Sequence, residues 1–294
     1  MYRRRYHVAG PMVLIALGAI FLLSNAGVLP IGAWDLLLRL WPLVLVAWGL
    51  EGLIGRGSAL GALLVIALTL GLGAGVVWYS VVTGAIHTSP LATRAISQPL
   101  GGASEAEVTI EMSIGALDVG GLIDSPLLIE GTVTEGGGLT AQPTVRTTGG
   151  ILHYTLKSEG FALLPGGPEW RLKLNGRVPI RLIVDHGVGG TKVDLSRLNI
   201  REAIIDTSIG DTIIIAPDQG RPRINVDHSI GTLLISVPQF VQARISIDTG
   251  IGAVDIGPRF HSVDKDIYET ERYEGADRRV EIIVDHSIGE LIVR

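Results

Sequence analysis

A short motif recurs every 21 residues in the second half of the chain, and it constrains the fold more than any other feature. Each copy reads as an aliphatic residue, Asp, His or Thr, a small residue, an aliphatic residue and Gly, with the glycines at positions 189, 210, 231 and 252. Another copy ends at Gly289, and a divergent copy without the Asp ends at Gly115. A fixed period of this length indicates one structural unit per repeat, each stacked on its neighbours.

Apolar residues alternate along the repeat, as in Leu233 and Ile235 after Gly231. A period of two is typical of β-strands. The apolar parity switches at the glycine, which predicts a bulge or a corner, because Gly adopts backbone angles that other residues avoid. We therefore expect residues 105–294 to form an all-β domain, a parallel β-solenoid or a closely related stack of strands. Gly210 and Gly231 should occupy equivalent positions in neighbouring coils.

One insertion interrupts the period, because the step from Gly252 to Gly289 is 16 residues longer than the others. The extra residues lie in 259–280, a highly charged stretch that contains Tyr268 and Tyr273. Insertions into a repeat usually form loops on one face. A solvated loop is one interpretation. The other is a partner-contact loop with Tyr268 and Tyr273 as the candidate contact residues, since tyrosine is enriched at interfaces.

Two copies of the motif contain the residue types of a catalytic triad, Asp227-His228-Ser229 and Asp285-His286-Ser287. Triad residues must converge in space, whereas consecutive residues of a strand point to opposite faces. Thr207 and Thr249 also replace His at the same repeat position. No segment matches the phosphate-binding pattern GxxxxGK[ST]. We expect a protein that is not an enzyme and has no catalytic residue and no cofactor.

The repeated aspartates offer one carboxylate per coil, at Asp185, Asp206, Asp227 and Asp248. Calcium sites between stacked turns need several oxygen ligands per turn, so we expect turn residues that accept backbone hydrogen bonds, and no metal site. The alternation of His and Thr at the next position predicts a hydrogen-bonded column inside the stack. A pH-sensing function of these histidines is the alternative.

The charge differs between the two parts of the chain. Residues 1–99 contain six Lys or Arg and two acidic residues, a net charge of +4, which leaves 18 basic and 27 acidic residues, a net charge of −9, for 100–294. An acidic domain argues against nucleic-acid binding, which requires a basic face. The absence of Cys excludes disulfides and thiolate metal sites.

Three apolar runs in residues 1–90 predict a transmembrane region, because about 20 apolar residues cross a bilayer as a helix. The runs are Pro11–Leu29, Leu36–Ile54 and Leu60–Val82. The second contains Arg39, Glu51 and Pro42, so a re-entrant segment is its alternative. Residues 91–104 are expected to be a linker to the β domain.

Basic residues before the first helix, Arg3-Arg4-Arg5, place the N-terminus in the cytoplasm. Three crossings then put the β domain outside, in a multi-pass protein of the cytoplasmic membrane. The first run could instead be a signal peptide that is cleaved after Ser24-Asn25-Ala26, which leaves the β domain on the same side.

Two stretches resemble known protein families. Residues 18–27, with Trp41-Pro42-Leu43 and Trp48-Gly49, resemble the transmembrane region of LiaI- and LiaF-like bacterial proteins. Ser113-Ile114-Gly115-Ala116-Leu117-Asp118-Val119, Trp170-Arg171-Leu172-Lys173-Leu174 and the glycine repeats resemble the toast-rack domain of the same kind of protein. Family descriptions count four spans where the sequence predicts three.

The resemblance implies a part in the cell-envelope response to wall-active antibiotics, often beside a sensor histidine kinase. The expected function is therefore a membrane-anchored accessory or regulator that acts by binding, with the lipid bilayer and a membrane protein as partners. The alternatives are an adhesin-like surface module and a structural scaffold without a ligand.

Overall fold

The computed structural model describes residues 91–136, 138–160 and 168–294. The predicted helices at 11–29, 36–54 and 60–82 lie outside these residues. In the described part of the chain, no helix is long and apolar enough to cross a membrane. The strands are β1 (Ala92–Pro99), β2 (Glu105–Ile114), β3 (Ala116–Leu122), β4 (Leu127–Glu135), β5 (Thr140–Thr148), β6 (Ile151–Glu159), β7 (Glu169–Asn175), β8 (Ile180–Val188), β9 (Thr191–Asp194), β10 (Ile200–Ile209), β11 (Thr212–Ile215), β12 (Arg223–Ser236), β13 (Gln242–Ile256), β14 (Phe260–Asp264), β15 (Ile267–Thr270) and β16 (Arg279–Val293).

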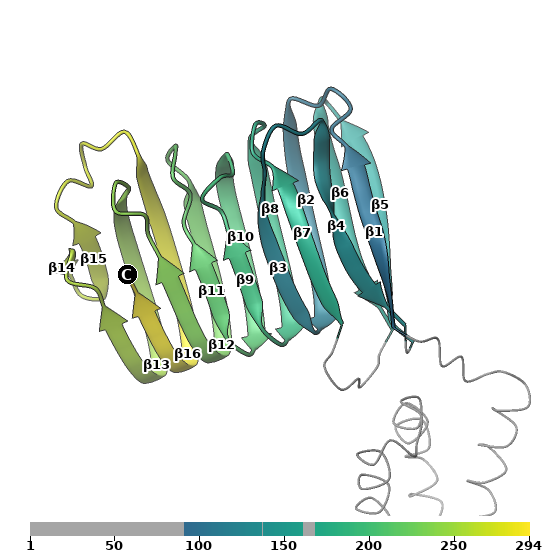
Figure 1. The fold of residues 1–294 in the computed structure, drawn as a ribbon. Helices are drawn as coiled ribbons and strands as arrows, with labels where there is room; N and C mark the ends of the chain where they lie inside the picture. The colour runs from purple at the N-terminus through teal and green to yellow at the C-terminus, as the bar shows by residue number, and fades with distance from the viewer. Residues whose placement is uncertain (1–90, 137, 161–167) are drawn as a thin grey trace, which may run out of the picture. The chain divides into compact units, whose positions relative to one another are not determined.

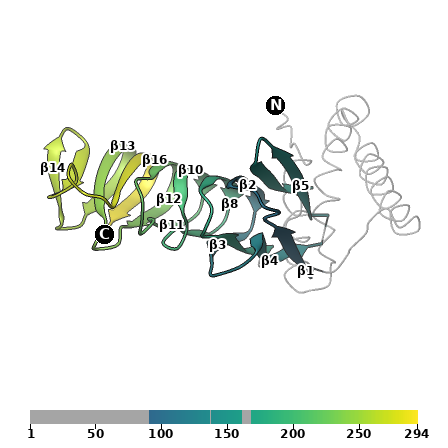
Figure 2. The same cartoon turned by 90° about the horizontal axis from the view of Figure 1, so that it is seen from above.

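The sixteen strands form one sheet that curls back on itself. One row runs in the order β5-β6-β2-β8-β10-β12-β16-β13-β15-β14, and the other in the order β1-β4-β7-β3-β9-β11-β12-β16-β13. The long strands β12, β16 and β13 pass through both rows. Figures 1 and 2 show the strands stacked along one axis, from β1 and β5 at one end to β14 at the other. The prediction of an all-β C-terminal part is confirmed.

The 21-residue spacing appears directly in the strand register. In the parallel pair of β10 and β12, Thr207 lies opposite His228, and in the pair of β10 and β8, Thr207 lies opposite His186. Motif positions that recur in the sequence therefore lie side by side, about 4.8 Å apart. The expected equivalence of Gly210 and Gly231 agrees with this register.

The motif glycines form the corner between the two rows. Gly210 has a φ of 136°, and a Cβ atom there would overlap the carbonyl oxygen of Gly189 in the neighbouring coil. Only glycine combines such a backbone angle with so close an approach. The parity switch in the sequence is this corner, after which the chain enters the second row.

The hydrophobic core lies between the two rows. Alternate residues of the first row, such as Val184 and Ile205, are fully buried, and so are Ile214 and Leu233 from the second row. Burial of one such aliphatic side chain contributes about 1.5–3 kcal/mol. The stack therefore buries what a single coil could not.

The coils are not stacked in chain order. The last strand, β16, lies between β12 and β13, so that Gly289 lies opposite both Gly231 and Gly252. Residues 259–280 carry the chain back over the end of the stack and contain β14 and β15, which pair antiparallel with each other. The insertion is therefore a cap and a return connection, whereas the sequence suggested a loop on one coil.

The β domain begins earlier than expected. Residues 92–99, assigned to a linker, form β1, which pairs antiparallel with β4. The guanidinium of Arg94 donates hydrogen bonds to the Glu135 carboxylate (2.8 Å) and to the Ala141 carbonyl (2.6 Å). These contacts join β1, β4 and β5, so the linker prediction was wrong for this segment.

Candidate binding surfaces

The two tyrosines of the insertion lie in different surroundings. Tyr273 is only 9% exposed and lies between two guanidinium groups, with Arg244 4.7 Å and Arg279 5.5 Å from its ring centre. Burial raises the pKa of the Tyr273 hydroxyl. Tyr268 lies opposite Ile245 and packs against the hydrophobic core while remaining partly exposed. Both side chains therefore help to hold the cap, and the expectation that they stand on an open surface was wrong for Tyr273.

A groove of about 670 Å³ runs beside Tyr273. Its walls include Phe240, which is 58% exposed and lies 5.7 Å from the Arg278 guanidinium. The rim carries both signs of charge, from Glu271, Arg272, Glu274, Asp277 and Arg278. An exposed aromatic side chain with a charged rim is the composition of many binding surfaces. Phe240 precedes the insertion, and no pattern in the sequence marks it as a surface residue.

The repeated Asp and His residues lie on opposite sides of the sheet. Asp227 is exposed on the outer face, whereas His228 is fully buried between the rows. The adjacent Asp and His therefore do not form a catalytic pair. The aspartates of neighbouring coils lie opposite one another within strands and not in turns. Partial burial and the carboxylates of Asp227 and Asp185 raise the pKa of Asp206.

The predicted hydrogen-bonded column is present in part: Thr207 bonds to His228, whereas His186 bonds to Thr191 of its own coil and Thr249 is exposed. The Thr207 hydroxyl lies 2.8 Å from His228 Nδ1, and the His228 and His286 rings stack with centres 5.0 Å apart. The Nε2 atoms of His186, His228 and His286 are buried and have no hydrogen-bond partner in the described residues. Burial lowers the pKa of His228, and the neighbouring His286 lowers it further. In the part of the chain that the structure describes, no cluster of three ligand side chains could hold a metal ion.

The aliphatic residue before each corner glycine is exposed, although its parity suggests a core position. Exposed fractions are 48% for Ile209, 43% for Ile230 and 45% for Ile288. These side chains lie opposite one another in successive coils. The corner therefore presents a row of exposed aliphatic side chains. No sequence signal predicts this exposure, because the same pattern is typical of a buried strand.

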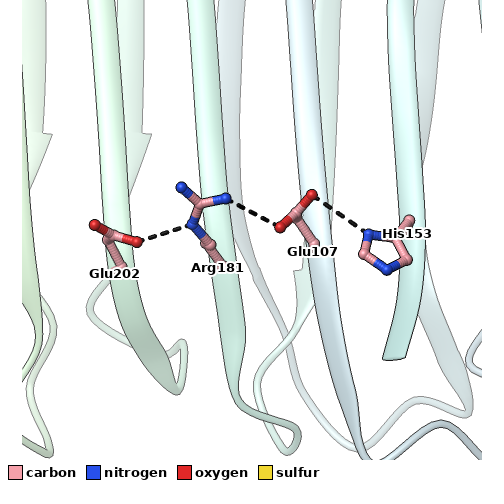
Figure 3. A network of polar contacts seen from close by, with 4 residues as sticks. All are labelled: Glu107, His153, Arg181 and Glu202. Atoms are coloured by element: carbon pink, nitrogen blue, oxygen red, sulfur yellow. Dashed lines mark hydrogen bonds and ion pairs between the residues drawn. The ribbon is translucent and has the colours of Figure 1, made fainter. Parts of the chain in front are cut away.

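A row of alternating charges crosses the outer face of the first row of strands. Figure 3 shows part of it, in which Glu202, Arg181, Glu107 and His153 come from β10, β8, β2 and β6. Arg181 donates to Glu202 at 2.8 Å and to Glu107 at 3.1 Å, and His153 Nδ1 lies 3.3 Å from Glu107. Partial burial raises the pKa of Glu107, but the hydrogen bonds from Arg181 and His153 outweigh this effect and lower the pKa.

The same register position continues the alternation over further strands, with Arg223, Glu281, Arg244 and Glu269. The ion pairs of Arg181 with Glu107 and Glu202 are partly exposed, and pairs of this kind contribute little stability each. The row favours one register of the strands, because a slip would separate the paired charges. No single repeat reveals this connection, because the residues come from different coils.

Residues 87–236, half of the chain, match the N-terminal domain of toast_rack, DUF2154. The chain belongs to the toast-rack family. Residues 8–53 match the LiaI-LiaF-like transmembrane region, so this toast-rack protein is membrane-associated. Both matches confirm the resemblance found in the sequence. No curated protein matches the chain.

A solved structure shares the fold of the β domain. A candidate cell adhesion protein from Clostridium sporogenes is 17% identical with a TM-score of 0.64, over 69% of this chain and 99% of that protein. A candidate adhesin from Bacteroides fragilis is 9% identical with a TM-score of 0.30, over 70% of this chain and 98% of that one. At 17% identity, the likeness to the first structure shows the fold alone. With a TM-score of 0.30, the second structure does not show a common fold.

Proposed function

We propose that this toast-rack protein is a non-enzymatic accessory of the cell-envelope stress response that acts by binding. Its N-terminal region would cross the membrane several times, and its β domain, a short β-solenoid, would lie outside the cytoplasm. The match to the LiaI-LiaF-like transmembrane region and the basic start of the chain support this arrangement. The partner we propose is another membrane protein, such as a sensor kinase.

The observation that carries the proposal is the groove at the cap. Phe240 exposes a large aromatic surface beside the groove, and the charged rim can pair with a partner of either sign. Tyr268 and Tyr273 hold the cap that forms the groove, so the contact surface we propose includes the insertion 259–280.

The test is recovery of a partner from membranes. The full chain is cross-linked in intact cells, purified, and its cross-linked membrane proteins are identified and quantified. Phe240→Ala should reduce recovery of the specific partner at least fivefold. Ile123→Ala, at a side chain that is 67% exposed in the turn after β3, is the matched control and should leave recovery unchanged. Equal recovery with both variants would reject the groove as the contact surface.

Topology has a separate test. A single cysteine from Glu274→Cys should react with an impermeant maleimide in intact cells if the β domain is outside. Protection until lysis would place the domain in the cytoplasm.

Adhesion is the second candidate function, favoured by the fold that the protein shares with the candidate cell adhesion protein. An adhesin would retain cells or polysaccharide on a surface coated with the protein, without any membrane partner. Retention that survives Phe240→Ala, with no cross-linked membrane protein, would favour adhesion.

A further inference from the structure

The two ends of the strand stack are closed differently. At the end formed by β1 and β5, each row terminates in an antiparallel strand, β5 on β6 and β1 on β4. At the other end, only the first row is extended, because β15 pairs with β13 through Arg244–Ser246 and β14 pairs with β15. The second half of β13 pairs with β16 on one side, and no described strand pairs with its other side.

Backbone groups at this edge lack the partners that inner coils have. In inner coils the N–H of the corner glycine donates to the next coil, from Gly189 to the Ile209 carbonyl at 2.8 Å and from Gly210 to the Ile230 carbonyl at 2.9 Å. Gly252 is the equivalent glycine of β13, and the structure describes no coil beyond it.

The direction of the other backbone groups follows from one bond. The N–H of Gly257 donates to the Val293 carbonyl of β16 at 2.8 Å. In a parallel ladder, alternate residues bond to opposite neighbours. Residues 253 and 255 therefore face β16, whereas Gly252, Val254 and Ile256 present their N–H and C=O groups at the free edge.

The side chains at this edge are core residues that the stack leaves uncovered. Val254 lies opposite Leu291 and Ile256 lies opposite Val293, and both of these partners in β16 are fully buried. Val254 is nevertheless 41% exposed. The open side of the last coil therefore exposes both apolar side chains and unpaired backbone.

Natural proteins usually protect free edges with proline, charge or a covering segment. The edge strand β5 contains Pro143 and Arg146. Residues 249–256 contain no Pro, Lys or Arg, and their one charged side chain, Asp255, forms an ion pair with Arg294. The edge of β13 thus lacks the protection that β5 has.

We propose that residues 252–256 form a β-augmentation site for one extended strand of a partner protein, with small polar residues around an aliphatic side chain that enters the open core. The proposal rests on the binding function proposed above, and it names the kind of segment that the partner contributes. The opposite end of the stack shows the chemistry that fits: β1 reads ATRAISQP, pairs antiparallel, and buries Ile96 in the core. Main-chain hydrogen bonds would give such a strand its affinity.

A second copy of the chain fits this edge poorly. Two copies related by a two-fold axis would pair β13 with β13 in the second row. In the first row, each copy carries β15 and β14 beyond β13. Four strands, about 19 Å wide at about 4.8 Å per strand, would then lie between the two copies of β13 in the first row, whereas the paired β13 strands of the second row would leave no gap between them. One added strand from a different protein would extend the second row without this conflict.

The experiment uses the purified full chain in detergent and a fluorescent peptide with the sequence of β1, Ala92–Pro99. Saturable binding, measured by fluorescence anisotropy, is expected. Val254→Arg should weaken it at least tenfold, because the charge would enter the open core. Val263→Arg is the matched control, since Val263 is 48% exposed on β14 of the same cap, and should change affinity less than twofold. Absence of saturable binding, or equal weakening by both variants, would overturn the proposal.

Hydrogen exchange gives a readout that nonspecific adhesion would not produce. Without peptide, the amides of Gly252, Val254 and Ile256 should exchange at least tenfold faster than those of Ala253 and Asp255. The peptide should slow only the first set, and uniform protection would contradict pairing at this edge. Loss of partner recovery with Phe240→Ala, without protection at 252–256, would reject this site and keep the proposed function. Protection of residues 252–256 by the peptide, without any cross-linked membrane protein, would keep this site and reject the proposed function.

Discussion

The corner glycines should be the least replaceable residues of the stack, and two adjacent glycines allow a matched test. Gly189 has a φ of 136°, and a Cβ atom there would come closer than 3.0 Å to the Gly115 carbonyl, a separation that real Cβ atoms essentially never show. Gly190, the next residue, has no atom within 4 Å of its Cβ position and no left-handed φ. Gly189→Ala should therefore destabilise the domain, and Gly190→Ala should not.

The magnitude follows from two effects. A non-glycine residue in this backbone region costs about 1–3 kcal/mol. Moving the two coils apart also weakens the bonds between them, from Gly115 to Val188 at 2.8 Å and from Leu117 to Gly190 at 2.9 Å, at about 1 kcal/mol each. Gly189→Ala should thus cost about 3–5 kcal/mol, or about 6–20 °C of melting temperature for a domain of this size.

The assay is thermal unfolding of the full chain in detergent, followed by the β-sheet signal in far-ultraviolet circular dichroism. Gly190→Ala should melt within about 2 °C of the unmodified protein, since open surface changes stay within about 0.5 kcal/mol. Equal melting temperatures for the two variants would refute the argument that close approach of the coils requires glycine at the corner.

Three further predictions concern the buried column, the cap and the charge row. Burial holds the folded-state pKa of His228 below its unfolded value of about 6.5, so the stability that His228 contributes should be present above that pH and decrease as the pH falls towards the folded-state pKa. His228→Thr, which introduces the residue found at the equivalent position of β10, should therefore reduce the change of melting temperature between pH 7.5 and 5. An unchanged pH dependence would contradict a buried neutral histidine. Tyr273→Ala should lower the free energy of unfolding in urea by about 3 kcal/mol, as for other buried aromatic residues, whereas Tyr273→Phe, which keeps the ring beside two guanidinium groups, should lower it by less than half as much. Similar losses for the two variants would mean that the hydroxyl, and not the packed ring, holds the cap. Arg181→Met should lower the free energy of unfolding, measured in urea, by about 1 kcal/mol or less, because its ion pairs are partly exposed. A loss above about 3 kcal/mol would show that the charge row is a main source of stability.

Local pattern determined much of the β domain. The period of 21 residues and the alternation of apolar side chains predicted which residues pair in β8, β10 and β12, because stacking equivalent positions is the arrangement that buries every coil alike. The parity switch at Gly210 predicted the corner, and the alternation of His and Thr predicted the hydrogen bond between Thr207 and His228. The resemblance to the toast-rack family also came from short motifs that the sequence displays without knowledge of the fold.

The tertiary structure alone decided how the stack begins and ends. Every copy of the motif presents the same backbone edges, so the sequence does not say which copy lies beside which. The position of β16 between β12 and β13 depends on the path of residues 259–280 around the cap. Burial depends on that order too. Ile230 and Val254 are aliphatic residues in a repeat like any other, yet the corner exposes the first, and the missing neighbour of the last coil exposes the second. Side-chain exposure at the edges of a stack is a property of what lies next to it, which no single repeat encodes.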